Sequence, residues 1–352
     1  GWRHSKYTTF AYKFGSRFES FANEQEQLQY FGLGVRADFR AQLAEPLTFR
    51  VRAGANLLSG YAQSRFGDNV GSSGILLQEA AMSYRMINTK AAQFFLVGGG
   101  LDQGVFEAPL LVDSQAFPGV RQVLALGTSD NFVFKLWAQQ AIPTSKTLST
   151  KAVESEITPT FMTQTASLEV MMGMVAIESF VTHYTYNSLP SAVALESDIY
   201  GNSIVETGPN TARFRYGFDG MMFSGGVKLY FSKRNMWQIG GYVLQNGEAP
   251  EGYHTAQHLV TAFKIGLPGD IDIMPALGMF FIEDDVVPGF YNSSMLGHNN
   301  RKGMTASLGT FFQKNRFRLT GRYVDAETIN LNLNQTRQQS FTISFETFYE
   351  IL

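Results

Sequence analysis

The chain has 352 residues, of which 44% are hydrophobic and 14% aromatic, but only 16% are charged. Soluble chains carry roughly a quarter charged residues, yet the mean hydropathy is only -0.09. This combination is typical of strands with one face toward lipid and the other toward water. The lack of cysteine excludes disulfides and thiolate metal sites, and the formal net charge of -2 argues against nucleic acid as a partner.

The sequence shows neither a signal peptide nor an apolar run long enough for a membrane-spanning helix. The first residues, GWRHSKY, are no signal peptide, so we expect the mature form of a secreted precursor. No apolar run approaches the roughly 18 residues of a spanning helix. The longest, Val170 to Ile177, is interrupted by Gly173.

The first three predicted strands, 8–19, 29–43 and 47–57, alternate apolar and polar side chains. Their basic residues stand opposite the apolar ones: Lys13, Arg17, Arg36, Arg40, Arg50 and Arg52. An arginine at the midplane of a bilayer costs roughly 2–4 kcal/mol, so these faces are expected to point inward.

The same pattern continues to the end of the chain. Further strands are predicted at 75–86, 91–101, 121–127, 132–142, 159–172, 175–186, 212–232, 236–246, 257–267, 271–282, 303–313, 317–326 and 338–352. This makes about sixteen strands. Strand counts of about fourteen and about eighteen are the alternatives. We find no helix and no second domain, so residues 1–352 are predicted to form one all-β, antiparallel, up-and-down transmembrane barrel.

Long connections alternate with short turns, as in outer-membrane barrels with long outer loops and short periplasmic turns. The long ones are 59–74, 102–119, 143–158, 187–211, 247–256, 283–302 and 326–336. Aromatic residues flank the short turns, where an interfacial girdle is expected: Phe231, Trp237, Phe312, Phe317 and Tyr349. The alternative is that aromatic residues simply favour strands.

This pattern resembles the general diffusion porins of Gram-negative outer membranes, which are sixteen-stranded trimers. The resemblance covers the whole chain and is architectural. It implies a homotrimer in the outer membrane, with membrane lipid and small hydrophilic solutes and ions as partners. Porins of this family usually end in Phe or Trp on the lipid-facing parity, whereas Ile351 holds that parity here.

Two sets of charged residues are candidates for the pore. The basic wall comprises Arg17, Arg36, Arg40, Arg50, Arg52, Arg318 and Arg322, and Glu169 and Glu178 are predicted to face it. Such an arrangement would produce a transverse field that orients polar solutes. The alternative is that paired charges merely solvate the wall.

The loop 102–119 is the second candidate. By resemblance it corresponds to the loop that folds inward in porins, with Asp102, Glu107 and Asp113 as constriction acids. Its apolar residues, Val105, Phe106, Leu110, Leu111 and Val112, suit packing inside a barrel better than exposure to water. A surface loop is the alternative.

Catalytic and metal-binding patterns are weak. His254 and His258 are four residues apart, a spacing that brings two metal ligands together only on a helix, and here a loop leads into a strand. His183 is predicted to be a lumen histidine bonded to a neighbour, and a scheme with Tyr184 and Glu178 is much less favoured. The run 283–285 is a solvated loop by default, with calcium binding the alternative. We predict no enzyme, no cofactor and no metal.

The sequence therefore predicts an outer-membrane porin that passes small hydrophilic solutes and ions by passive diffusion. The arginine wall favours a mild anion preference, which the acidic loop offsets. The main alternative is a substrate-specific channel or an adhesin-like barrel that binds a ligand through its long loops, especially 187–211. An outer-membrane enzyme comes third, and a soluble β-protein is least favoured. Pore size, solute range and the sign of the ion selectivity stay open.

Overall fold

The structure is a computed structural model that describes residues 8–23, 27–61, 74–89, 91–129, 131–144 and 156–351. Residues 1–7 and most of the predicted loops 59–74 and 143–158 lie outside the described residues.

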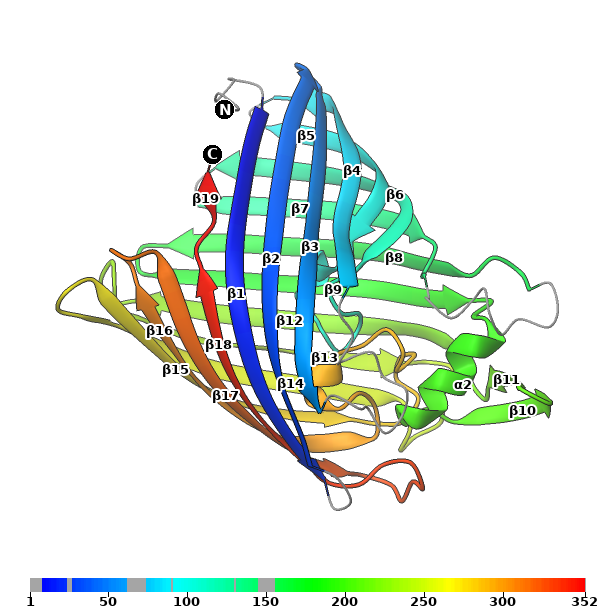
Figure 1. The fold of residues 1–352 in the computed structure, drawn as a ribbon. Coiled ribbons are helices and arrows are strands. Elements are labelled where there is room, and N and C mark those ends of the chain that lie inside the picture. The colour runs from blue at the N-terminus through cyan, green and yellow to red at the C-terminus, as the bar shows by residue number, and fades with distance from the viewer. Residues whose placement is uncertain are drawn as a thin grey trace.

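Sixteen antiparallel strands of the described chain close into a barrel, as the alternation predicts (Figure 1). Each pairs with the barrel strands before and after it, and the first pairs with the last. They are β1 (Thr8–Asn23), β2 (Gln27–Ala44), β3 (Leu47–Tyr61), β4 (Gly74–Asn88), β5 (Ala92–Asp102), β6 (Ala116–Ser129), β7 (Phe132–Ala141), β8 (Thr160–Met172), β9 (Val175–Asn187), β12 (Phe218–Tyr230), β13 (Met236–Asn246), β14 (Thr255–Leu267), β15 (Ile271–Ile282), β16 (Arg301–Phe312), β17 (Phe317–Thr328) and β18 (Gln338–Thr347), which the short β19 (Glu350–Ile351) continues.

The short turns form where the sequence allows a tight reversal. Gly173, between β8 and β9, has a φ of 59°. Gly269 and Asp270, between β14 and β15, have φ values of 79° and 56°. Glycine adopts this left-handed region without steric cost, and aspartate tolerates it better than most residues.

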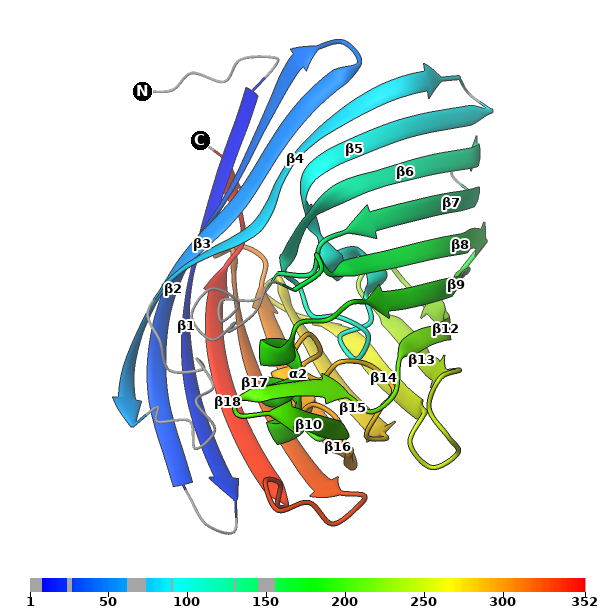
Figure 2. The same cartoon turned by 90° about the vertical axis from the view of Figure 1, so that its right-hand side faces the viewer.

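The region predicted as the strand 212–232 is divided. A hairpin of β10 (Ile204–Gly208) and β11 (Thr211–Phe214) precedes β12, and the helix α2 (Ser191–Ile199) precedes the hairpin (Figure 2). The prediction of no helix was therefore wrong. Only nine residues form α2, too few for a clear helical period. No helix in the described part of the chain is long and apolar enough to cross a membrane.

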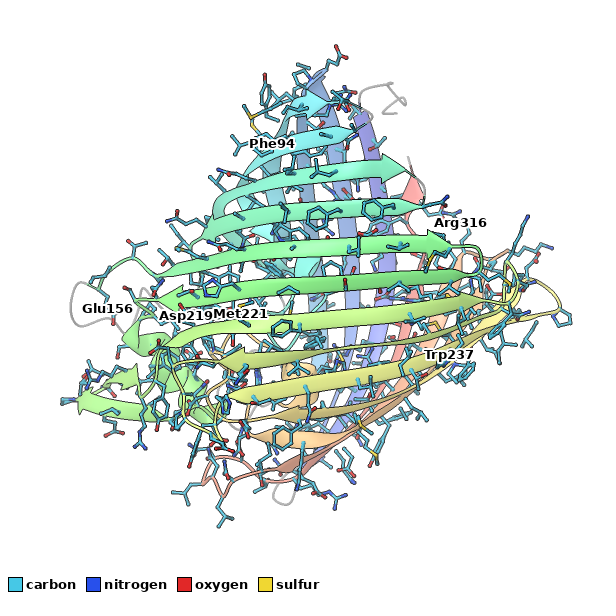
Figure 3. All side chains as sticks on the ribbon, turned by 180° about the vertical axis from the view of Figure 1, so that it is seen from behind. Phe94, Glu156, Asp219, Met221, Trp237 and Arg316 are labelled. Carbon is cyan, nitrogen blue, oxygen red and sulfur yellow. The ribbon has the colours of Figure 1, made fainter. Side chains whose placement is uncertain are left out.

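The outer face of the barrel carries the apolar side chains (Figure 3). Leu277 and Met304, for example, are 64% and 65% exposed there. Near the short turns the rings of Phe312 and Phe317 stack with centroids 4.5 Å apart. Tyr349 does not join this outward group, because its ring lies 5.4 Å from the ammonium of Lys13, an inward-facing residue. The last strand is interrupted between β18 and β19, so the strict alternation predicted to its end was wrong.

A hydrophobic core lies inside the barrel. It is built from the segments 103–115 and 283–300, which include the short 3-10 helices η2 (Gln103–Phe106) and η3 (Ser294–Leu296). Both segments pack on the inner faces of the strands on one side of the barrel, and α2 adds Val193. The lumen is therefore asymmetric. The core packs against β6 to β9, β12 to β15 and part of β17, whereas β1 to β3, β17 and β18 carry most of the predicted basic residues.

Candidate functional site

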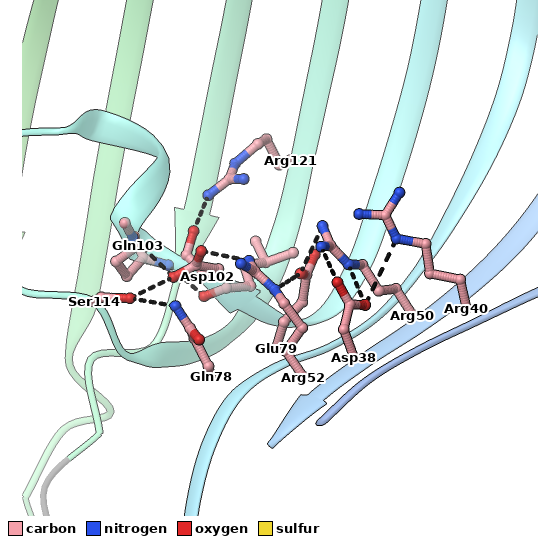
Figure 4. Close-up of polar contacts among 12 residues, drawn as sticks. Asp38, Arg40, Arg50, Arg52, Gln78, Glu79, Asp102, Gln103, Ser114 and Arg121 are labelled. Atoms are coloured by element: carbon pink, nitrogen blue, oxygen red, sulfur yellow. Dashed lines mark hydrogen bonds and ion pairs between the residues drawn. The ribbon is translucent and has the colours of Figure 1, made fainter. Parts of the chain in front are cut away.

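Alternating charges form a ladder on the inner faces of β2, β3 and β4 (Figure 4). Arg50 binds Asp38 with two hydrogen bonds, of 3.0 Å from Nε and 2.6 Å from Nη2. Its Nη1 lies 3.4 Å from Oε2 of Glu79, and Arg52 Nε donates to the same oxygen at 2.8 Å. Arg40 completes this end with Nε 3.6 Å from Asp38 Oδ1.

The ladder ends at the root of the loop 103–115. Arg52 Nη2 donates to Asp102 Oδ2 at 2.5 Å. The other carboxylate oxygen of Asp102 accepts a 2.9 Å bond from the Gly104 N–H and so caps η2. Arg121 Nη2 donates to the Asp102 carbonyl at 3.0 Å. Asp102 thus fixes the loop to the wall and neutralises the last arginine of the ladder.

Strand register explains this arrangement. Asp38 pairs directly with Arg52, and Arg40 with Arg50, so the charges of β2 and β3 share one face. On β4 a bulge at Gln78 changes the parity, so that Glu79 joins the inner face. Sequence reasoning missed Glu79 for this reason, since strict alternation from Ile75 places it outward. It also missed Arg121, although Arg121 follows the inward parity of β6.

The ladder members Arg40, Arg50 and Arg52 balance Asp38, Glu79 and Asp102 one for one. The other predicted basic residues are less balanced. Arg318 and Lys13 share Glu346, at 2.5 and 3.2 Å, and Arg17 pairs with Glu19. Within the described residues, Arg36 and Arg322 have no ion pair; Arg322 contacts the Met295 sulfur.

The remaining predicted acids do not face the basic wall as free charges. Glu169 pairs with Lys135 at 2.6 Å and Glu178 with Lys228 at 3.1 Å. Lysines on adjacent strands therefore neutralise both carboxylates. Glu107 is exposed just after η2, and the exposed Asp113 accepts a bond from the Ser114 N–H at 2.7 Å. Of the three predicted loop acids, only Asp102 lies in the ladder.

Tyrosines of the inner wall hold both internal segments. Tyr186 Oη donates to the Leu111 carbonyl at 3.3 Å, and Tyr242 Oη accepts from the Leu110 N–H at 3.2 Å. Tyr184 Oη donates to the Val286 carbonyl at 2.9 Å. These bonds satisfy backbone groups that would otherwise be buried without partners. The positions of both segments are therefore fixed by the wall.

The segment 283–300 is anchored by buried polar groups. Asp284 and Asp285 are buried, so the expectation of a solvated acidic loop was wrong. Burial and the neighbouring carboxylates raise the pKa of Asp284 to about 6. His298 donates from Nδ1 to the Gly289 carbonyl at 2.8 Å, and burial lowers its pKa to about 3. Desolvation disfavours the charged form of both groups.

These two pKa values predict opposite responses to pH. The packing that His298 supports is fully stable above its ordinary pKa of 6.5 and weakens as the pH falls toward 3. The contribution of Asp284 is fully present below its ordinary pKa of 3.8 and is lost as the pH rises through about 6. We expect the protection factors of the amides in 283–300, which correct the exchange rates for the intrinsic effect of pH, to change little with pH in the wild type. In Asp284→Asn, acidification should loosen the segment. Identical pH profiles would contradict this.

His183 lies on the outer face, so its expected place in the lumen was wrong. Nε2 lies 2.8 Å from Asp219 Oδ1, and Thr185 Oγ1 donates to Asp219 Oδ2 at 3.2 Å. Tyr184 and Glu178 have the opposite, inward parity on β9. No hydroxyl of the described residues bonds to His183, so this cluster does not form a nucleophile–base pair.

No family model matches the chain, and no curated protein is similar enough in sequence to match it. Solved structures are similar. Pseudomonas putida OprB at high pH has a TM-score of 0.65 and 9% identity, covering 97% of this chain and 94% of that chain. Vibrio cholerae OmpT without loop L8 has a TM-score of 0.54 and 9% identity, covering 98% and 100%. Salmonella typhi OmpF with daunomycin has a TM-score of 0.54 and 8% identity, covering 96% and 97%. The chain has the fold of the outer-membrane porins, a closed barrel of sixteen antiparallel strands.

Proposed function

We propose that the chain forms a water-filled channel in the outer membrane of a Gram-negative bacterium and passes small hydrophilic solutes and ions by passive diffusion. The observation that carries the proposal is the two-sided wall. Its outer face is apolar and suits contact with lipid, while its inner face carries the ladder Arg40–Asp38–Arg50–Glu79–Arg52–Asp102. Charges at such density are tolerated in a bilayer only where they line an aqueous space.

The excess of cations supports a mild anion preference. Arg36 and Arg322 have no carboxylate partner within the described residues, whereas the opposite wall holds balanced pairs such as Glu169–Lys135 and Glu178–Lys228. A solute in the lumen would therefore meet a positive side and a neutral side. Low-dielectric walls strengthen such a field.

By its resemblance to porins we propose a homotrimer without enzymatic activity. Passive diffusion of solutes through a barrel requires no catalysed reaction. Within the described residues, the His183 cluster supplies no activated nucleophile. The membrane lipid then contacts the apolar outer face.

Single-channel recording in a planar lipid bilayer under a salt gradient tests the proposal. We expect ohmic steps in groups of three and a small reversal potential of anion-selective sign. A matched preparation of heat-denatured protein controls for detergent leaks. Protein that is folded, as judged by its strand spectrum, and yet gives no steps would contradict the proposed channel.

A substrate-specific channel is the second candidate, favoured by the amount of structure inside the barrel. The segments 103–115 and 283–300 together fill one side of the lumen, and buried tyrosines bind their backbones. A passage restricted in this way would give small, brief steps that one solute blocks. The same recordings, repeated with a panel of solutes, separate the two candidates.

A further inference from the structure

A long cavity of about 600 Å³ lies inside the barrel along the neighbouring strands β1, β2 and β18 (Figure 1). Its lining on β1 extends from Lys13, on the side of the short turns, to Asn23, on the side of the long loops. With a rise of about 3.3 Å per residue, this is about 33 Å along the strand, or about 25 Å along the axis of a barrel whose strands tilt by about 40°. The apolar outer band of such barrels is about 25 Å tall. The lining therefore spans the height of the apolar band.

The opposite wall of the cavity is built by the inner segments. Tyr200, at the end of α2, and Met295, in η3, both line it. Arg322 of β17 contacts the sulfur of Met295. In the strand register Arg322 pairs with Thr342 of β18, and Thr342 pairs with Glu19 of β1. Met295 therefore bounds the cavity near the level of Glu19, between its two ends.

Three glycines leave the barrel wall without side chains in the middle of the cavity. Gly15, Gly32 and Gly34 line it from β1 and β2, and Gly15 pairs directly with Gly34. None of the three has a left-handed backbone, so the local conformation does not require glycine. A Cβ at Gly34 would meet the side-chain oxygen of Asn56 at 2.8 Å, and the nearest backbone atom lies 3.6 Å away. The glycines therefore form a recess that keeps this part of the lumen open.

The charged lining of the cavity has an excess of cations: Lys13, Arg17, Arg36 and Arg301 against Glu19 and Glu346. Both carboxylates already have basic partners. Apolar side chains also line the cavity: Phe21, Leu28, Leu58, Ile199 and Met295. A small organic anion would therefore meet positive charge for its oxygens and apolar contact for its carbon skeleton.

The inner face of β2 connects the cavity with the ladder. Gly34 and Arg36 belong to the lining, and Asp38 and Arg40, which follow on the same face, belong to the ladder. None of the six ladder residues lines the cavity itself. A solute that moves along the cavity toward the short turns therefore reaches the ladder after Arg36.

We propose that small organic anions cross the barrel along this cavity, and that the recess formed by Gly15, Gly32 and Gly34 together with Met295 sets the largest anion that passes. The inference rests on the proposed function and deepens it, since it names the route and the class of solute. The cations of the lining attract the anion, and the glycines provide the space in which it passes the inner segments.

The lack of cysteine allows a test on an open channel. In Gly34→Cys the introduced thiol is the only one in the chain, so a methanethiosulfonate reagent modifies that position alone. The two probes are the sulfonatoethyl reagent, which is anionic, and the trimethylammonium-ethyl reagent, which is cationic. Channels are recorded under a gradient of potassium butyrate before and after each reagent is added.

We expect the unmodified channel to pass butyrate, with a reversal potential of anion-selective sign. Both reagents should remove most of the conductance, because either adduct fills the recess. In the remaining current, the anionic adduct should lower the relative permeability of butyrate by about fivefold, since the added charge repels the anion, and the cationic adduct should not lower it. Arg36→Cys, at an exposed position of the same lining, provides a second thiol if Gly34→Cys does not fold.

Gly321→Cys is the matched control. Gly321 lies on the outer face of β17, between the exposed side chains of Leu319 and Tyr323, and no atom lies within 4 Å of its Cβ position. Lipid excludes the charged reagents there, so the conductance should not change. The wild type, which has no thiol, should not respond to either reagent.

Two results would overturn the proposed route: full conductance after modification of Gly34→Cys that mass spectrometry shows to be complete, or a wild type that conducts potassium and excludes butyrate. Either result leaves the proposed channel in place, because the wild type still conducts. A folded wild type without any conductance contradicts the proposed function and the route with it.

Discussion

Replacement of Arg50 and Arg52 together by alanine is expected to convert the proposed anion preference into a cation preference. The two arginines occupy the centre of the ladder, and their loss leaves Asp38, Glu79 and Asp102 without these partners. Each removed charge changes the energy of a passing ion by on the order of 1 kcal/mol in a screened lumen, about fivefold in relative permeability. The reversal potential under a salt gradient measures the change.

The control variants for this prediction should separate charge from stability. Asp38→Asn removes a carboxylate from the same ladder and should shift the reversal potential in the opposite direction. Arg316→Ala, at an exposed turn outside the lumen, should leave it unchanged. A double variant that keeps the wild-type reversal potential would show that the ladder does not set selectivity.

Leu111→Ala is expected to loosen the segment 103–115 and to enlarge the passage. Leu111 is fully buried within the core that joins this segment to the wall, and its carbonyl accepts the bond from Tyr186. Truncation of a buried leucine typically costs about 2–5 kcal/mol, because it removes apolar contacts and leaves a cavity. Single-channel conductance should increase and become noisier, and hydrogen exchange of residues 103–115 should accelerate.

Val105→Ala is the matched control, since Val105 lies in the same segment but is 39% exposed. It should cost much less and leave conductance unchanged. If Leu111→Ala accelerates exchange but leaves conductance as it was, the segment does not limit the passage. If neither quantity changes, the packing described here does not hold the segment in place.

The barrel itself could be predicted because its cause is local. Alternation of side chains is visible in each strand, and the order of short and long connections follows directly from the positions of turn residues such as Gly173 and Gly269. The predicted strand limits were therefore close over most of the chain. Strand β6 was predicted too short, and it begins at Ala116, inside the segment assigned to a loop.

The errors arose where one residue changes the pattern. A single bulge at Gln78 moves Glu79 to the inner face, and the interruption after β18 places Tyr349 beside Lys13. Nothing in the local composition indicates either event. The helix α2 was missed because its nine residues lie in a long loop and are held by packing rather than by a strong intrinsic preference.

The candidate site could be predicted only in part. The inward orientation of the arginines could be predicted, because placing them in lipid is costly. The carboxylates with which they pair could not be predicted. Arg52 meets Asp102 across 50 residues, and Tyr184 meets Val286 across 102 residues. Such contacts depend on register and on the path of long loops, neither of which a single sequence specifies.

The junction of β1 with β18 has a consequence for how the chain folds. Lys13 and Glu346, which meet there, are 333 residues apart, whereas every other strand pair of the barrel joins consecutive barrel strands. Until that junction forms, the sheet has two open edges whose N–H and C=O groups lack partners. In lipid such edges are strongly unfavourable, so we expect closure of this junction to be the step that completes the barrel and stabilises it. We expect a chain without β18 to keep two strand edges with unpaired N–H and C=O groups. Such a chain should aggregate through these edges rather than form a smaller barrel.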